Sequence, residues 1–287
     1  MSQSKLILHA IILALNEEPF IKVQLDTIYP FCNRISIITQ YDRDWYGQML
    51  TPDATVSIIL NYPDPDGKIN LIIRRFPDEA AARNMEMLSF NRKSFNGIKS
   101  HGASLAEIND FHSPPDYFWI IDSDEIYDSD TLPGIIDYLI LKRPSGMRIT
   151  GYNYLRNWNR RVPREIIDFT HFGFLKPGLL FEQRRVISWN ESRLAKFLKA
   201  VRLPDFSAKI FGFITCPEEI GVFHHGCWLG DNDRIVKKFS KSSHMESKEW
   251  APDSVDLIKT IYVDRENLPE NIRNANWPKN YFSERKA

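Results

Sequence analysis

The sequence predicts an α/β fold: a single domain whose central sheet is mostly parallel and flanked by helices, followed by an irregular C-terminal region. Three observations lead to this prediction. Strand-like and helix-like runs alternate in the first third of the chain, as they do where crossover helices join parallel strands. Residues 6–15 form a nearly continuous aliphatic run, which is typical of a strand covered on both faces. The 287 residues are 43% hydrophobic and 13% aromatic, enough for a substantial core.

Local patterns predict the elements of the first half. Residues 17–28 carry apolar side chains at helical spacing and end before Pro30, so we expect a helix there. Residues 79–90 should form another helix, because three consecutive alanines give this stretch high helix propensity. Short apolar runs predict the strands, at residues 6–15, 34–39, 55–60, 69–74 and 117–121.

The second half is less regular and richer in arginine and aromatic residues. We expect strands at 148–154 and 178–184 and helices at 192–201 and 233–242. Residues 264–287 lack periodicity, so we expect this tail to wrap the surface or to fray. The predicted organisation is one domain with two halves, residues 1–145 and 146–263, followed by the tail.

The charge is balanced overall but not locally. The 37 basic and 37 acidic residues leave no net charge, which argues against nucleic acid or a membrane surface as a bulk electrostatic partner. Residues 101–140 nevertheless contain nine acidic residues and no Lys or Arg, whereas residues 156–202 contain eleven basic residues and four acidic ones. The first segment is suited to a cation and the second to anionic groups of a substrate or product.

Cysteine content and hydropathy bear on the compartment. Cys32, Cys216 and Cys227 are too few and too scattered for a disulfide framework, so we interpret them as ordinary buried thiols in a reducing compartment. Residues 6–15 are too short for a signal peptide and lack a small-residue cleavage site. No stretch approaches the roughly 20 apolar residues of a membrane helix, so we expect a cytoplasmic protein without a transmembrane segment.

The clearest chemical signal is an apolar strand that ends in acidic residues. Phe118 to Ile121 are followed by Asp122, Asp124 and Glu125 within four positions. Three carboxylates crowded at a sheet edge cost free energy unless a cation neutralises them. Their hard oxygen atoms suit Mg²⁺ or Mn²⁺, and either ion can bridge carboxylates to a diphosphate. We therefore expect Mn²⁺ or Mg²⁺ as the cofactor.

This motif resembles the Asp-x-Asp motif of the A-fold (GT-A) glycosyltransferases, and three further segments resemble the same superfamily. Residues 11–18 look like its opening strand and first loop, as in family 2-type enzymes. The pair Arg83-Asn84 is similar to one that opens a helix near the nucleotide. Residues 221–230, with the lysine-bearing stretch and the histidine up to residue 244, resemble the family of the bisecting N-acetylglucosaminyltransferase. The four segments cover about half of the chain and follow the superfamily's order.

The resemblance implies an activity and a set of site residues. The protein would move a sugar from a UDP- or GDP-sugar to a glycan or other hydroxyl acceptor, usually with inversion, with residues 1–145 binding the donor and 146–263 the acceptor. The metal ligands would be Asp122, Asp124 and His225, with His224 as the substitute for His225. The donor-binding residues would be Leu15, Asn16, Glu17, Asp42, Arg83, Asn84, Asp122, Ser123 and Lys237.

An inverting transfer also needs a carboxylate that accepts the proton of the acceptor hydroxyl. The candidates are Asp168, Glu182 and Glu191, with Glu218 and Glu219 also available. Glu182 and Glu191 lie among arginines, which favour the ionised form that a base requires. Trp158 is surrounded by polar and basic residues, so it is the tryptophan that we expect to stack on a sugar.

Three other readings of the same pattern remain open. A sugar-phosphate nucleotidyltransferase would share the sheet and the acidic ligands, but it should carry a glycine-rich phosphate loop near the N-terminus, and none is visible. A glycosyltransferase that modifies nucleic-acid bases would use the basic segment 156–202, although we expect no stable nucleic-acid partner. A non-enzymatic binding protein could retain the fold without the activity.

Overall fold

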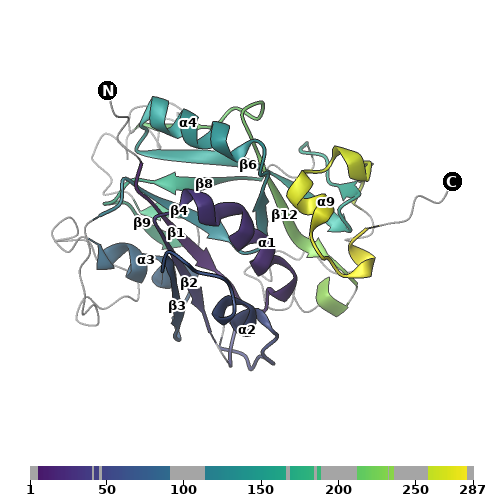
Figure 1. Ribbon diagram of the computed structural model, residues 1–287, viewed down its shortest axis with the longest axis horizontal. Coiled ribbons are helices and arrows are strands. Elements are labelled where there is room, and N and C mark those ends of the chain that lie inside the picture. Colours follow the sequence, from purple (N-terminus) through teal and green to yellow (C-terminus); the bar gives the residue numbers. More distant parts are fainter. Residues whose placement is uncertain are drawn as a thin grey trace, which may run out of the picture.

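In the computed structural model, the described residues form a mixed β-sheet of eleven strands (Figure 1). The structure describes residues 6–40, 42–44, 47–90, 114–165, 169–183, 186–188, 212–231, 233–235 and 258–282. The N-terminal part of the sheet is parallel and has the order β4-β1-β2-β3. Its strands are β1 (Leu8–Leu13), β2 (Arg34–Thr39), β3 (Ile69–Ile73) and β4 (Tyr117–Asp122). This part confirms the α/β prediction and the parallel pairing expected of buried aliphatic strands.

The long strand β6 (Gly146–Arg156) organises the second half. On one side, β8 (Thr170–Leu175) joins β6 to β4 through antiparallel pairs. On the other side, β12 (Phe223–Leu229) runs parallel to β6 and also pairs antiparallel with β5 (Glu125–Tyr127). The shorter strands are β7 (Arg160–Arg161), β11 (Phe213–Thr215), β13 (Ile261–Tyr262) and the separate pair β9 (Leu180–Gln183) and β10 (Val186–Ser188).

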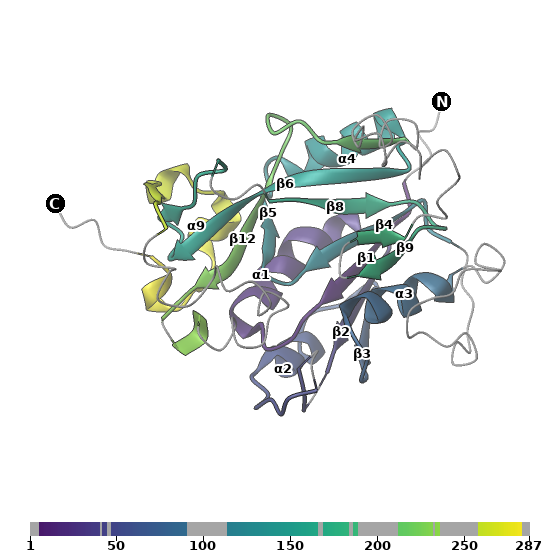
Figure 2. The same ribbon diagram turned by 180° about the vertical axis from the view of Figure 1, so that it is seen from behind.

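Helices cover both faces of the parallel part (Figures 1 and 2). Helices α1 (Glu18–Ile28), α2 (Thr55–Leu60) and α4 (Leu132–Lys142) contribute to one apolar cluster with alternate residues of β1 and β4. Helix α3 (Glu79–Ser89) packs with the intervening residues of the same two strands and with β9. Because successive side chains of a strand point to opposite faces, the aliphatic run of β1 supplies both clusters.

Most of the predicted elements are confirmed, with one clear error at residues 55–60. This stretch forms α2 instead of a strand. The carboxylate of Asp53 accepts a hydrogen bond from the amide of Thr55 at 2.8 Å, which supports the start of a helix. Thr55 and Ile59, four residues apart, are buried on one helical face, while Leu60 is exposed. The periodicity of so short an apolar run does not distinguish a strand from a helix.

The C-terminal tail is also more ordered than we expected. It contains η6 (Arg265–Asn267), α9 (Glu270–Asn274) and η7 (Lys279–Tyr281), which lie beside β12 at one end of the sheet (Figures 1 and 2). Its side chains Ile272, Trp277 and Tyr281 are buried against Phe20 and Trp158. The tail therefore completes a core of the protein, because its aromatic residues cover apolar surface that would otherwise face water.

Trp158 belongs to this aromatic core, so its expected role in stacking on a sugar is wrong. Its side chain is fully buried and contacts Tyr154 and Trp277 at ring-centroid distances of 5.0 Å and 5.3 Å. The predicted helix 192–201 lies outside the described residues, and of the predicted helix 233–242 only 233–235 are described, as helical. Within the described part of the chain, no helix is long and apolar enough to cross a membrane.

Close packing of β6 against β12 predicts that Gly151 tolerates no side chain. A Cβ atom on Gly151 would overlap the ring of Phe223 and come within 2.8 Å of Phe169. Gly151→Ala should lower the free energy of unfolding by about 1–3 kcal/mol, the usual cost of overpacking. Gly134→Ala in α4 is the matched control, because its Cβ would have ordinary contacts with Ile220 at 3.5 Å. The control should be neutral or stabilising by up to about 1 kcal/mol in urea unfolding, and equal losses for both variants would contradict the prediction.

Candidate functional site

The acidic turn after β4 lies at the carboxyl edge of the parallel strands. Leu13 of β1 pairs with Asp122 of β4, and the carbonyl oxygen of Leu13 accepts a hydrogen bond from the amide of Ser123 at 3.1 Å. The fully buried Glu125 accepts a hydrogen bond from the amide of Asp122 at 3.1 Å. The turn is thus held from both sides, and the edge it occupies is where open α/β sheets place their ligands.

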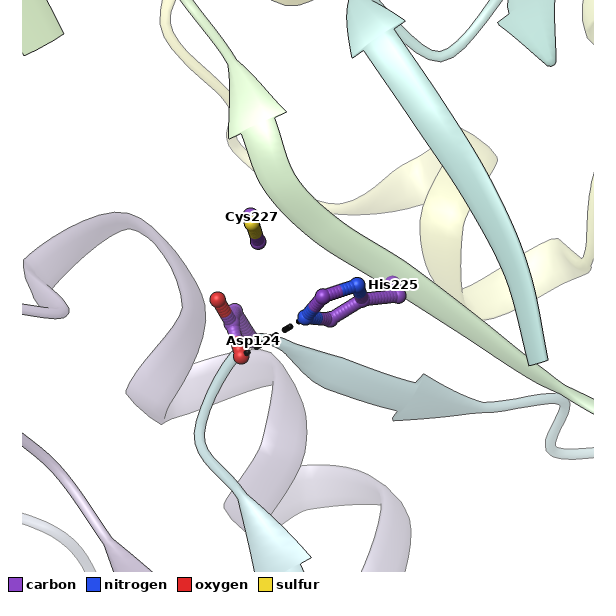
Figure 3. A group of neighbouring side chains, drawn as sticks. All are labelled: Asp124, His225 and Cys227. Carbon is purple, nitrogen blue, oxygen red and sulfur yellow. Dashed lines mark ion pairs between the residues drawn. The ribbon is translucent and has the colours of Figure 1, made fainter. Parts of the chain in front are cut away.

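Strand β12 brings His225 to this turn from far along the chain. The antiparallel pairing of β12 with β5 sets His225 opposite Glu125, and the amide of Gly226 donates to the carbonyl oxygen of Asp124 at 2.8 Å. The Nε2 atom of His225 then lies 3.6 Å from Oδ1 of Asp124. Cys227 lies beside both side chains, and one ligand atom from each of the three falls within 4.8 Å of the others (Figure 3).

The imidazole of His225 is held in one orientation. Its Nδ1 lies 2.7 Å from Oδ1 of Asn153, and its ring stacks on Phe169 with centroids 4.3 Å apart and an interplanar angle of 14°. An amide oxygen only accepts hydrogen bonds, so Nδ1 carries the hydrogen in this contact. In the neutral ring, Nε2 therefore presents its lone pair towards Asp124, which is the arrangement of a metal-binding histidine with its partner.

His224 occupies the opposite side of β12 and has a different environment. Its Nδ1 is hydrogen-bonded to the hydroxyl of Tyr154 at 2.7 Å, and the two rings stack. Burial, with the nearby charge of Arg161, lowers the pKa of His224 to about 3. His224 is therefore a neutral core residue, and of the two histidines it is His225 that faces the acidic turn.

Asp122 is directed towards α3. Its Oδ1 accepts a hydrogen bond from Nη2 of Arg83 at 2.6 Å, and Nη1 of Arg83 lies 3.5 Å from Glu79. Arg83 is fully buried, so it is not an exposed helix residue. Within the described residues, the group that could hold a metal is Asp124, His225 and Cys227, and it does not include Asp122. The structure thus pairs two of the expected site residues with each other.

Asn84, which we expect to bind the donor, is bonded to the backbone of β9 in this structure. Its side-chain amide donates to the carbonyl oxygen of Phe181 at 2.7 Å and accepts from the amide of Phe181 at 2.8 Å. Both polar ends of this buried side chain are engaged with the backbone of β9. Asn84 therefore ties α3 to β9, and a nucleotide could reach its amide only by displacing these two bonds.

The loop after β1 approaches the same edge as the acidic turn. Leu15 and Asn16 are half-buried, and Asn16 has a left-handed backbone with φ of 55°. Its side chain donates to the carbonyl oxygen of Thr51 at 2.7 Å. Glu17 is buried, and its Oε2 lies 3.5 Å from Nη2 of Arg234.

Arg234 joins this loop to β12. Its Nη1 donates to the carbonyl oxygens of Cys227 and Leu229 at 3.1 Å and 2.6 Å, and its guanidinium lies 5.0 Å from the centre of the Phe20 ring. The contacts that the structure gives Arg234 are thus all within the protein. Arg234 connects the N-terminal loop with the strand that carries His225.

Asp42 lies after β2 and is paired with Arg75. Hydrogen bonding to Arg75 holds the pKa of Asp42 below its ordinary value.

Asp168, Glu191 and Lys237 lie outside the described residues. Glu182 lies in β9, and only its backbone is described. Glu218 forms an ion pair with Arg164 and accepts from the hydroxyl of Tyr152 at 3.3 Å.

Cys227 is the site residue that the sequence analysis missed. We interpreted it as an ordinary buried thiol, yet it stands with Asp124 and His225 in the group that could hold a metal. A signal was available, because Cys227 follows His225 by two residues in a predicted metal-binding segment and side chains two apart in a strand share a face.

Comparisons with known proteins give a distant structural likeness. No protein-family model matches the sequence, and no curated protein matches it significantly. Among solved structures, residues 1–349 of TarS from S. aureus are similar at a TM-score of 0.39 and 11% identity, covering 88% of this chain and 69% of TarS 1–349. The same fragment in complex with UDP-GlcNAc gives a TM-score of 0.41 at 11% identity, covering 95% and 68%. The longer TarS structure gives 0.38 at 12% identity, and this chain covers 42% of it.

The ion pair between the fully buried Arg83 and the partly buried Asp122 is expected to be important for stability. Arg83→Met would leave the Asp122 carboxylate without its guanidinium partner and should lower the free energy of unfolding by about 3–5 kcal/mol. Lys22→Met is the matched control, because it breaks the exposed pair with Asp26 in α1 and should cost at most about 0.5 kcal/mol. Equal urea midpoints for the two variants would contradict this role of Arg83.

Because burial lowers the pKa of His224, we expect the free energy of unfolding to depend on pH. This pKa is about 3 in the folded protein and 6.5 in its ordinary state, so between these values the unfolded chain binds a proton that the folded protein excludes. The free energy of unfolding should therefore fall as the pH is lowered through this window, by at most about 1.4 kcal/mol per pH unit. His224→Gln should reduce this slope in urea unfolding at a series of pH values. Parallel curves for wild type and variant would argue against the assignment.

Proposed function

We propose that this chain is a metal-dependent glycosyltransferase that moves a sugar from a nucleoside diphosphate sugar to a hydroxyl acceptor, with inversion. The observation that carries the proposal is the meeting of Asp124 and His225, from segments 101 residues apart, at the carboxyl edge of the parallel strands. The sequence motifs around these two residues are the ones that resemble GT-A glycosyltransferases. Their approach in space supports treating them as parts of a single site.

The residues present fit a divalent cation. Asp124 offers a carboxylate oxygen, and His225 offers Nε2, with Asn153 bound to the other ring nitrogen. Both side chains are largely buried, with exposed fractions of 6% and 11%. A buried carboxylate of this kind favours a cation close by, and borderline ions such as Mn²⁺ accept both oxygen and nitrogen. When bound, Mn²⁺ or Mg²⁺ would neutralise charge that develops on the departing diphosphate.

The residues around the turn would bind and orient the donor. The half-buried Leu15 and Asn16 lie in the loop after β1, next to the acidic turn, where a UDP- or GDP-sugar would find backbone and side-chain polar groups. Asp122, with 26% of its side chain exposed, would meet the ribose or the sugar while Arg83 holds its carboxylate in place. Ser123 is buried between the two aspartates and would fix their spacing.

The proton of the acceptor hydroxyl would pass to a carboxylate of the second half. Asp168, Glu182 and Glu191 remain the proposed general bases, since the basic residues around Glu182 and Glu191 favour ionised carboxylates. Among the other carboxylates of this half, Glu218 is paired with Arg164.

Asp124 provides the direct test. Purified protein should hydrolyse or transfer sugar from a UDP- or GDP-sugar only when a divalent cation such as Mn²⁺ or Mg²⁺ is present, and Asp124→Asn should lower the rate by about 10²-fold or more. Asp130→Asn is the matched control, because Asp130 belongs to the same acidic segment but is exposed. Its activity should equal that of the wild type, and full wild-type activity in excess chelator would refute the metal dependence.

Thermal unfolding with a panel of nucleoside diphosphate sugars would identify the donor. A ligand present at 100 times its Kd should stabilise the protein by about 2.7 kcal/mol, and this gain should require the metal and be lost in Asp124→Asn. If no nucleoside diphosphate or its sugars stabilise the wild type with Mn²⁺ or Mg²⁺, the donor assignment is wrong.

A further inference from the structure

We propose that Cys227 is a third protein ligand of the ion held by Asp124 and His225, so that the site prefers thiophilic and borderline divalent ions, such as Co²⁺ and Zn²⁺, over Mg²⁺. The inference rests on the metal site of the proposed function, but it concerns which residues bind the ion and which ion they select. It does not depend on the identity of the donor or the acceptor.

The placement of the three side chains supports a common ion. One oxygen of Asp124, one ring nitrogen of His225 and the sulfur of Cys227 all lie within 4.8 Å of one another (Figure 3). Ligands that are about 2.0–2.3 Å from a tetrahedral ion are roughly 3–4 Å apart, so small adjustments of side-chain torsions would bring the three atoms to bonding distance. Cys227 is only 7% exposed, so its sulfur lies near the other two ligand atoms in a largely buried setting.

An irregularity in β12 lies at this point. His225 pairs with Asn153 of β6 and Trp228 pairs with Leu155, so β12 uses one residue more than its partner between the two pairs. Such a bulge redirects side chains and is common beside functional sites. It falls at Gly226 and Cys227, so it sets the direction of the Cys227 thiol relative to His225.

The backbone around Cys227 is fixed by three contacts. The amide of Gly226 is bound to the Asp124 carbonyl at 2.8 Å, and the carbonyl of Cys227 accepts from Arg234 at 3.1 Å. A Cβ atom at Gly226 would overlap the ring of Phe20, so the strand lies directly on α1 here. Holding the ligands on rigid, well-packed elements is what a metal site requires.

The other two cysteines lie in apolar surroundings, outside any group of possible metal ligands among the described residues. Cys32 and Cys216 are buried in the apolar cluster that α1, α2 and α4 form with β1 and β4. Burial raises the pKa of Cys32 to about 12 and that of Cys216 to about 11. In the described part of the chain, neither belongs to a group of side chains that could hold a metal. They provide natural controls, because replacing either one removes a buried thiol without touching the proposed site.

A thiolate in the site would change the choice of ion. Mg²⁺ requires oxygen ligands in near-octahedral geometry, so a set of one oxygen, one nitrogen and one sulfur suits it poorly. Thiolate and imidazole suit Zn²⁺ and Co²⁺, and their affinity exceeds that of Mn²⁺ for most such sites. On binding, the thiol of Cys227 would release its proton to solvent and the sulfur would donate its electron pair to the ion.

Cobalt spectroscopy tests the inference without any measurement of catalysis. Co²⁺ added to the metal-free protein should produce visible d–d bands and a near-ultraviolet band of thiolate-to-cobalt charge transfer. Cys227→Ser should lose the near-ultraviolet band, keep visible bands and bind Co²⁺ at least about tenfold more weakly, since even partners of metal ligands contribute 10–100-fold. Cys216→Ser should show both sets of bands and wild-type Co²⁺ affinity. Mg²⁺ in large excess should not displace Co²⁺ from the wild type.

The outcomes separate this inference from the proposed function. Two results would overturn the role of Cys227 and leave the Asp124 and His225 site in place. One is a wild-type spectrum with visible bands but no near-ultraviolet band. The other is a near-ultraviolet band that persists in Cys227→Ser. Absence of any cobalt bands in the wild type would overturn both the third ligand and the metal site. Nucleotide-sugar binding, measured by thermal unfolding, reports separately on the donor assignment.

Discussion

The candidate site depends on one structural constraint, the double pairing of β12. This strand runs parallel to β6 and antiparallel to β5, so it is locked between the long strand of the second half and the short strand that follows the acidic turn. A shift of one residue in the β12 register would turn His225 away from Asp124 and His224 towards it. The stacking of His224 on Tyr154 and of His225 on Phe169 fixes the observed register from both faces.

The three carboxylates of the acidic segment can be close together because each one has a different partner. Asp122 is paired with the buried Arg83, Glu125 accepts from the amide of Asp122, and Asp124 faces His225. Burying an unpaired charge is expensive, and Arg83 offsets this cost for Asp122. The neutral His225 does not neutralise Asp124, which is why we propose a bound cation there. The three carboxylates therefore have different roles. Asp122 connects the turn to α3, and Glu125 binds the backbone of the turn. Asp124 faces the strand that carries His225 and Cys227.

Long-range packing holds this arrangement together. Arg234 connects the loop after β1 with the carbonyl groups of Cys227 and Leu229, and Phe20 of α1 packs directly on Gly226. The C-terminal tail adds Trp277 and Tyr281 to the aromatic core beneath Phe20. The N-terminal loop, β12 and the tail therefore support the same candidate site, in which His225 and Cys227 lie on a packed strand and Asp124 lies in the turn between β4 and β5.

The sequence by itself determined the α/β class, the parallel strands of the first half and the acidic turn at the end of β4, because these follow from local hydrophobic patterns. It also marked His225 as a candidate, although its role as a metal ligand stays a prediction. It did not determine residues 55–60, where a short run of mostly apolar residues fits a strand or a helix equally well, nor the burial of Trp158 and the tail. Only the tertiary structure decided that Arg83 pairs with Asp122 and that Cys227 joins Asp124 and His225. The Arg83–Asp122 pair depends on how α3 packs against β4. The grouping of Cys227 with His225 depends on the register and the bulge of β12 against β6, two segments more than 70 residues apart.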